Sequence, residues 1–209
     1  IAGNIWLGQE YFPGLSLSGT KSEIDYFAGL YSSDDKPEFD GAFKYGQFGI
    51  LSLGRDYADK FNLEKSYFRL DFMFQEDDGN DEVEDFNDWK GAYSFVTKWE
   101  NNAWYFWTDL SFADRKEGDV WGIQLMPFYD ITDKTQVIFC YTHLESSGDN
   151  QLRASRWEDR LDRGAYRGDD LTEYFLGLNH FFYGHKLKWQ NGLQYTELEQ
   201  AGTKEYEGW

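Results

Sequence analysis

Residues 65–75 read KSYFRLDFMFQ, a stretch in which large apolar and polar side chains alternate. The apolar positions are Phe68, Leu70, Phe72 and Phe74, and the opposite positions include Tyr67, Arg69, Asp71 and Gln75. Successive side chains of a β-strand point to opposite faces of the sheet, so this period of two predicts a strand with one apolar and one polar face.

The same alternation recurs along the chain in segments rich in aromatic and β-branched residues, which are separated by Gly, Asp and Asn clusters. We predict eleven strands, the last beginning near residue 205. The predicted ranges of the others are 14–20, 24–32, 40–56, 65–75, 90–100, 103–114, 119–129, 135–146, 170–183 and 186–198. We find no convincing amphipathic helix.

The predicted connections alternate in length. Short ones fall at 21–23, 58–64, 101–102, 130–134 and 183–185. Long or polar ones fall at 32–39, 76–88, 114–118, 147–169 and 199–204. In an antiparallel meander this places the long connections at one end of the sheet, as in bacterial outer-membrane barrels.

An apolar sheet face can be buried either in a soluble core or in lipid, and two features favour lipid. The predicted strands are about 10–12 residues long, near the tilted length that a bilayer requires. Aromatic residues also gather near strand ends, as they do at membrane interfaces: Trp99, Trp104, Trp121, Tyr129, Phe182 and Trp189. The longest stretch without a charged side chain, 174–185, is too short for a helical span. The sequence therefore predicts an antiparallel transmembrane β-barrel, a single domain over 1–209.

The predicted strands and connections average about 19 residues each, so a 16-stranded barrel would need roughly 300 residues. We therefore expect the chain to be part of a larger barrel. On this prediction the chain lacks the N-terminal strands of that barrel and the end of its last strand. A complete barrel of 10 or 12 strands is the alternative.

The net charge of −18 disfavours nucleic acid as a partner, because phosphates require a basic surface. Residues 76–88 hold eight acidic residues and no basic one, which predicts a solvated loop. A divalent-cation site is the alternative, although the spacing does not match an EF-hand.

Cys140 is the single cysteine, so no internal disulfide forms. We find no catalytic motif, and we predict neither an enzyme nor a cofactor or metal site.

Several short motifs in the second half of the chain occur in a characteristic order. They are Asp119–Gly122, Met126–Lys134, Ser147–Asn150, Gly168–Asp170, Gly177–Asn179 and Tyr183–Lys188. Together they resemble the C-terminal half of the phosphate-selective porin family (porins O and P). The resemblance implies a 16-stranded barrel, usually a homotrimer, in the outer membrane of a diderm bacterium, where it contacts lipid and lipopolysaccharide. It also implies passive diffusion, with selectivity for anions such as phosphate in the best-known members. The acidic balance departs from a phosphate channel, and so does Cys140 at a polar-face position where we expect arginine in many relatives.

Two sets of residues are candidates for contact with permeating ions or solutes. The candidate pore-lining residues are Arg69, Asp71, Lys98, Asp109, Gln124, Glu173, Asn179, Lys186, Lys188, Gln190 and Gln194. The candidate constriction residues lie in the connection 147–169, and they are Arg153, Arg156, Arg160, Arg163 and Arg167. Guanidinium groups attract anions and bind them in a bidentate manner. The alternatives are an ordinary solvated strand face and a surface loop of mixed charge.

A passive pore is the function that these patterns favour. An outer-membrane scaffold or adhesion barrel with a blocked lumen is the first alternative, in which the acidic connection binds a partner or Ca²⁺. A soluble carbohydrate-binding β-protein is the second, suggested by the tryptophan and aspartate content.

Overall fold

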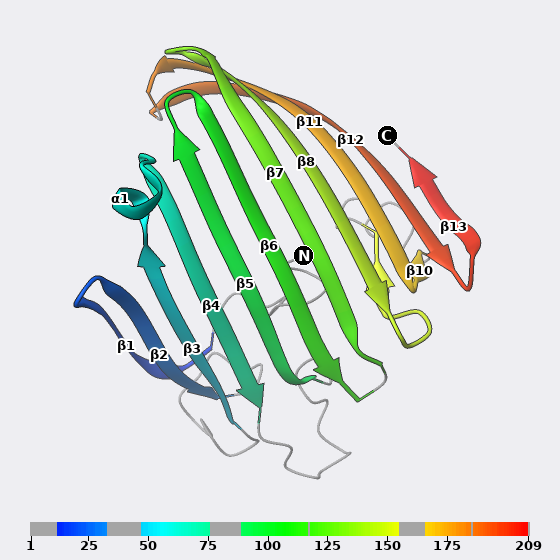
Figure 1. The fold of residues 1–209 in the computed structure, drawn as a ribbon. Coiled ribbons are helices and arrows are strands. Elements are labelled where there is room, and N and C mark those ends of the chain that lie inside the picture. The colour runs from blue at the N-terminus through cyan, green and yellow to red at the C-terminus, as the bar shows by residue number, and fades with distance from the viewer. Residues whose placement is uncertain are drawn as a thin grey trace.

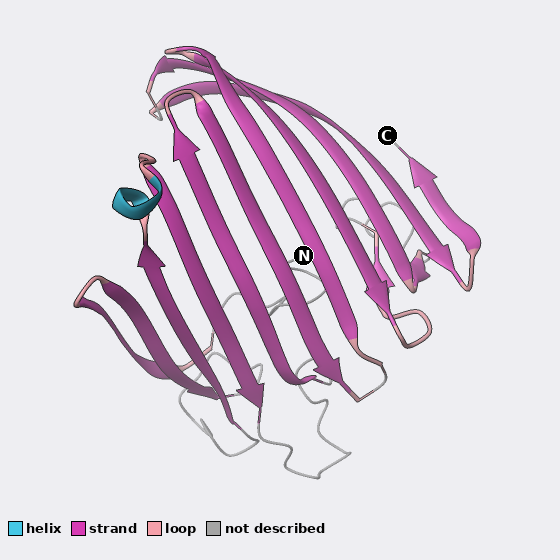
Figure 2. Cartoon of the chain, viewed as in Figure 1, coloured by secondary structure: helices cyan, strands magenta, loops and turns pink. Residues whose placement is uncertain are grey.

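The computed structural model describes residues 12–32, 47–75, 89–116, 118–154, 166–184 and 186–208. These residues are almost entirely β (Figures 1 and 2). Eleven strands form one antiparallel sheet, which confirms the predicted number, and Figure 1 shows that the sheet is twisted and strongly curved. Its strands are, in spatial order, β1 (Gly14–Lys21), β2 (Ile24–Ser32), β3 (Gln47–Asp56), β4 (Lys65–Gln75), β5 (Trp89–Asn101), β6 (Trp104–Arg115), β7 (Val120–Thr132), β8 (Thr135–Ser146), β11 (Asp170–Tyr183), β12 (Leu187–Gln200) and β13 (Thr203–Gly208).

The predicted strands agree with the observed ones apart from small shifts at their ends. The first part of the predicted strand 40–56 lies outside the described residues, as does the acidic run 76–88. Three short elements were not predicted: the one-turn helix α1 (Ala58–Phe61) and the paired segments β9 (Leu152–Arg153) and β10 (Arg167–Gly168). The prediction of a long connection at 199–204 is wrong, because a two-residue turn at Ala201 and Gly202 joins β12 to β13.

The tight turns follow from the backbone conformations of their residues. Ser22 and Glu23, between β1 and β2, both have positive φ (52° and 66°), as a twisted two-residue hairpin requires. Asn102 takes the same region in the turn between β5 and β6, and asparagine tolerates it well. These turns and the connections from β7 to β8 and from β11 to β12 lie at one end of the sheet, called here the short-turn end. The connections 33–46, 76–88 and 147–169 leave from the other, the long-connection end.

The register aligns the apolar positions of neighbouring strands on one face of the sheet. Leu51 pairs with Phe72, Phe72 with Tyr93, Tyr93 with Phe112, and Phe112 with Trp121. We call this side the apolar face. Its side chains are exposed: Leu70 is 45% exposed, Leu176 55% and Leu193 67%. The sheet therefore turns a broad apolar surface outward instead of burying it in a core.

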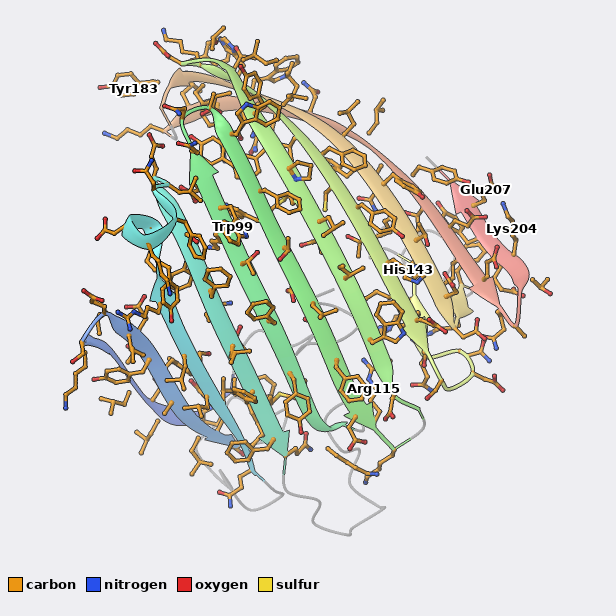
Figure 3. All side chains as sticks on the ribbon, viewed as in Figure 1. Trp99, Arg115, His143, Tyr183, Lys204 and Glu207 are labelled. Carbon is orange, nitrogen blue, oxygen red and sulfur yellow. The ribbon has the colours of Figure 1, made fainter. Side chains whose placement is uncertain are left out.

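Charged side chains return on the apolar face close to the long-connection end of β12 and on β13. Lys204 Nζ lies 3.0 Å from Glu207 Oε2 and also contacts Glu197 (Figure 3). Tyr195 Oη donates a 2.6 Å hydrogen bond to the Glu207 carboxylate. The apolar surface thus gives way to a polar network on this side.

The opposite face, called here the polar face, carries a buried apolar band at the long-connection end. We name this the inner band, and its members are Phe48, Met73, Ala92, Ala113, Val120, Leu144, Leu171 and Leu198. Leu152 of β9 and Ala154 pack into the same cluster, and the Tyr166 ring lies tilted against that of Tyr206 with centroids 4.9 Å apart. β9, β10 and their described neighbours Ala154 and Tyr166 therefore pack against the polar face.

The sheet has two edges in the described part of the chain. There β1 pairs with β2 alone, and β13 with β12 alone, so the described strands do not close into a ring. No helix among the described residues is long and apolar enough to cross a membrane.

Candidate functional site

The middle of the polar face is a row of hydrogen-bonded polar side chains from adjacent strands. Ser52 of β3, Asp71 of β4, Ser94 of β5 and Ser111 of β6 are successive register partners. Arg69 Nε donates to Asp71 Oδ2 over 2.9 Å, and Ser94 Oγ donates to the same oxygen over 3.0 Å. Asp71 is 8% exposed, so its charge is stabilised by these donors instead of by water.

The row continues across the remaining strands by the same kind of contact. Ser111 Oγ donates to Asp109 Oδ1 over 2.6 Å on β6. On β11 and β12, Gln194 Nε2 and Thr196 Oγ1 both donate to Glu173 Oε1, over 2.9 and 3.2 Å. Donors therefore hold the carboxylates in fixed positions on this face.

The candidate pore-lining residues lie together on the polar face, with one exception. The register assigns to it Arg69, Asp71, Lys98, Asp109, Gln124, Glu173, Asn179, Lys188, Gln190 and Gln194. The exception is Lys186, which lies in the turn before β12, where its backbone N–H donates to the Tyr183 carbonyl. Lys186 lies in the turn because β12 begins one residue later than predicted.

Two candidate constriction residues are among those that the structure describes. Arg153 of β9 is the register partner of Arg167 of β10, so two guanidinium-bearing positions lie side by side. Arg156, Arg160 and Arg163 lie outside the described residues. Hydrogen bonds join the segment to the sheet: the backbone N–H of Asn150 donates to Gln200 Oε1 over 3.0 Å, and that of Asp169 to the Glu199 carbonyl over 2.8 Å.

The polar face is acidic in the middle of the described strands. Asp71, Asp109 and Glu173 carry negative charge there, and Arg69 is already paired with Asp71. Cys140 occupies a polar-face position beside Phe175, and its Sγ lies 3.8 Å from Thr142 Oγ1. No row of basic side chains crosses the middles of these described strands.

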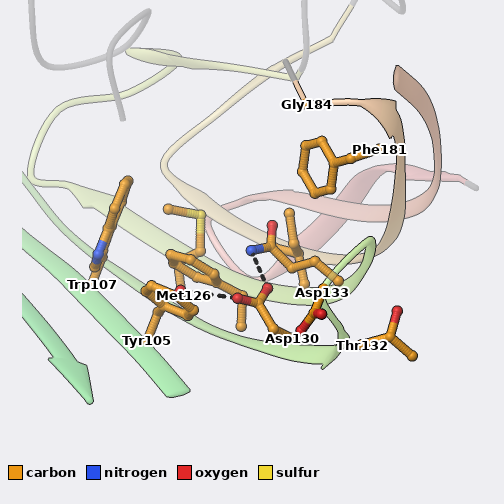
Figure 4. A pocket seen from close by; sticks show the side chains of 11 residues that line it. Tyr105, Trp107, Met126, Asp130, Thr132, Asp133, Phe181 and Gly184 are labelled. Carbon is orange, nitrogen blue, oxygen red and sulfur yellow. Dashed lines mark hydrogen bonds between the residues drawn. The ribbon is translucent and has the colours of Figure 1, made fainter. Parts of the chain in front are cut away.

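An aromatic cavity lies on the polar face near the short-turn end, and sequence reasoning missed it. Its volume is about 470 Å³ (Figure 4). Tyr105 stacks on Phe128 with ring centroids 4.6 Å apart, and Trp107 meets Phe128 edge-on at 5.0 Å. The signal was present in the sequence, because at 104–107 and 127–129 bulky residues occupy both faces of the predicted strands.

The site thus combines a hydrogen-bonded acidic row, the paired arginine positions of β9 and β10, and an aromatic cavity, all on one face of a curved sheet. Comparisons with protein-family models, curated proteins and solved structures find no match for this chain, so its resemblance to porins O and P stays a prediction.

Proposed function

We propose that this chain forms the wall of an outer-membrane pore through which small polar solutes diffuse passively. The observation that carries the proposal is the division of the sheet into two faces. One face exposes large apolar side chains from β1 to β12, and the other holds hydrogen-bonded polar and acidic groups. Such alternation is the arrangement of a barrel strand between lipid and a watery lumen.

The extent of the exposed apolar surface supports lipid as its environment. It runs across adjacent strands through register pairs such as Phe139 with Leu176 and Leu176 with Leu193. Soluble monomers rarely expose a contiguous apolar patch of more than a few hundred Å². Strands such as β4, β5 and β11, with 11, 13 and 14 residues, also reach the length of a tilted span.

Aromatic residues at the short-turn end fit a membrane interface. Trp104 and Tyr129 lie against each other on the apolar face with ring centroids 4.4 Å apart. Phe182 and Trp189, 56% and 53% exposed, occupy the same end on β11 and β12. Indole and phenol rings favour the headgroup level, where one side of the ring is apolar and the other is wet.

The charges of the described wall favour cations or neutral solutes over anions. Asp109 accepts a hydrogen bond from the Ser111 hydroxyl, and Glu173 accepts hydrogen bonds from the Gln194 amide and the Thr196 hydroxyl. A ring of carboxylates lowers the energy of a cation in a narrow pore and raises that of an anion. Phosphate selectivity, and the homotrimer implied by the family resemblance, are left as predictions.

Planar-bilayer recording of the full chain tests the proposal, with two variants at adjacent positions. Gln194→Trp places an indole on the polar face and should lower the single-channel conductance. Leu193→Trp places the same group on the apolar face, where the native leucine is 67% exposed, and should leave conductance unchanged. A bilayer that stays sealed at all voltages, or equal effects of both variants, would contradict the pore.

A barrel with a blocked lumen is the second candidate, and the inner band is the observation that favours it. Leu152 and Ala154 are buried in one cluster with Leu144, Leu171 and Leu198, so these two residues occupy part of the polar-face side. Replacing residues 150–167 with a short Gly-Ser linker separates the two functions. A native chain that is sealed but conducts after the replacement supports the scaffold. A native chain that already conducts, and conducts more after it, supports the pore.

A further inference from the structure

We propose that the aromatic cavity on the polar face binds a neutral saccharide, whose pyranose rings pack against Trp107 and Phe128. The proposal goes beyond passive diffusion, although it concerns the same face of the sheet. It follows from three properties of the cavity: its apolar ring surfaces, its fixed polar groups and its charge.

The ring surfaces come from adjacent strands. Trp107 and Tyr105 lie on β6, Phe128 lies on β7, and Phe181 of β11 faces them across the cavity (Figure 4). The three rings of β6 and β7 are partly exposed, so a ligand can reach them. The face of an aromatic ring is negative, and it attracts the weakly positive C–H groups that line one side of a pyranose. This surface therefore suits a saturated ring that has an apolar face.

Fixed polar groups run from the aromatic rings across the next strands. Tyr105 Oη donates to Asp130 Oδ2 over 2.9 Å, and Gln136 Nε2 donates to Asp130 Oδ1 over 2.8 Å. The relay continues from Asn179 Nδ2 to Gln136 Oε1 over 3.1 Å and from Gln190 Nε2 to Asn179 Oδ1 over 2.9 Å. These bonds hold the carboxylate and amides in place. Asp130 and Gln136 line the cavity, whereas Asn179 is 7% exposed and supports Gln136 from the next strand.

This pattern of donors and acceptors matches the edge of a sugar. Each hydroxyl of a pyranose both donates and accepts a hydrogen bond, and several point outward around the ring. The relay extends over β7, β8, β11 and β12, further than one ring requires. We therefore expect an oligosaccharide to bind more tightly than a monosaccharide.

The carboxylates of the cavity disfavour anions as ligands. Asp130 and Asp133 line it, and no lysine or arginine is among its described lining residues. The Lys98 ammonium lies over one face of the Trp107 indole, with Nζ 4.5 Å from the ring centre, so this face of the ring is covered. Its volume of about 470 Å³ falls within the range of about 300–1,000 Å³ that is typical of small-molecule sites.

Isothermal titration calorimetry of the full chain folded in detergent micelles tests the proposal without requiring conductance. The probes are maltose, cellobiose and maltotriose, with sorbitol as an acyclic polyol and inorganic phosphate as an anion. We expect saturable binding of at least one of the saccharides and none of sorbitol or phosphate. Absence of saccharide binding, or equal binding of sorbitol or phosphate, would overturn the proposal.

Three variants locate the binding site. Phe128→Ala removes one ring surface and should weaken saccharide binding roughly tenfold, the scale of losing one stacked aromatic. Asp130→Asn keeps the shape of the cavity but removes a charged acceptor, so it should also weaken saccharide binding. This variant provides the test if Phe128→Ala fails to fold. Phe106→Ala removes a ring from the apolar face of the same strand, β6, and should leave the affinity unchanged.

The outcomes for the pore and for the saccharide site are distinguishable. A sealed bilayer with saccharide binding in micelles would remove the pore and leave the cavity as a binding site. A conducting pore whose calorimetry shows no saccharide binding would remove the saccharide site and leave passive diffusion. Equal affinities of Phe128→Ala, Asp130→Asn and the native chain would place any saccharide elsewhere and overturn the assignment.

Discussion

Leu176 and Glu173 are three residues apart on β11 and point to opposite faces of the sheet. Leu176 is 55% exposed between Phe139 and Leu193, whereas the Glu173 carboxylate accepts hydrogen bonds from Gln194 and Thr196. A charge placed at the first position would face lipid in the proposed pore, and a charge at the second already faces its donors. The loss of stability caused by introducing a charge should therefore depend on which face of the sheet the substituted residue occupies.

Leu176→Arg should lower the free energy of unfolding in lipid vesicles by about 2–4 kcal/mol, the cost of arginine facing the middle of a bilayer. The matched control is Gln194→Arg, which places the same charge on the polar face beside Glu173 and should change stability by less than about 1 kcal/mol. Denaturant titration of tryptophan fluorescence measures both. Equal costs would show that the apolar face does not face lipid.

The contact between Arg69 and Asp71 allows a second test at this scale. Asp71→Ala leaves Arg69 and Ser94 without their acceptor, and we expect it to destabilise the fold by about 1–2 kcal/mol. The loss is modest because the Arg69 side chain is 41% exposed and water screens its charge. A double-mutant cycle with Arg69→Ala should give a positive coupling energy, and additive effects would deny the pair any role.

At the scale of elements, the strands are held in register partly by aromatic rings that lie over glycines. Gly177 of β11 and Gly192 of β12 are register partners on the polar face. A Cβ at either position would collide with the ring of Phe175. The same arrangement occurs where Tyr67 covers Gly54. Each pair fills the space left by a missing side chain and fixes the two strands relative to each other.

Gly192→Ala should therefore destabilise the protein by about 1–3 kcal/mol, because the Phe175 ring has to move. Phe175→Leu should relieve the collision, so the double variant should be more stable than the sum of the single effects predicts. Thermal unfolding in micelles, followed by circular dichroism, measures all three. Strict additivity would show that the ring accommodates the methyl group without cost.

Most strands could be predicted from the sequence, because a strand with one apolar and one polar face shows an alternation of apolar and polar residues. Residues 65–75 gave both the bounds and the faces of β4. The elements that escaped prediction depend on tertiary contacts. β9 and β10 are two residues each, and they pair because Leu152 is buried against Leu144 and Leu171. The burial of Ala92 and Ala113 could not be predicted either. A small residue at a polar-face position is compatible with both exposure and burial, and only its tertiary contacts decide between them.

At the scale of the whole molecule, the sequence predicted which face each candidate side chain points to, but not which of these side chains lie close together. Parity placed Asp109, Glu173 and Gln194 on one face, which the register bears out. The aromatic cavity escaped prediction because it joins residues as distant in sequence as Tyr105 and Phe181, which the curvature of the sheet brings together. Sequence periodicity gives the direction of each side chain, whereas the curvature that makes them meet depends on packing along the whole sheet.

The acidic middle of the polar face leads to a prediction for the complete assembly. Asp109→Asn combined with Glu173→Gln should reduce the preference for potassium over chloride, since both substitutions remove negative charge from the proposed wall. The reversal potential across a KCl gradient measures this preference. Glu145→Gln is the control, because Glu145 lies on the apolar face, where Trp121 Nε1 donates to it over 3.1 Å. An unchanged reversal potential in the double variant would remove these carboxylates from the ion path.

The two edges of the described sheet restrict the number of strands that a closed ring can have. In an antiparallel sheet each strand reverses the direction of the one before, so the first and eleventh strands point the same way. Joining β1 directly to β13 would create a parallel seam in an otherwise antiparallel ring. A seamless ring that includes all these strands therefore requires an odd number of additional strands, whichever polypeptide supplies them.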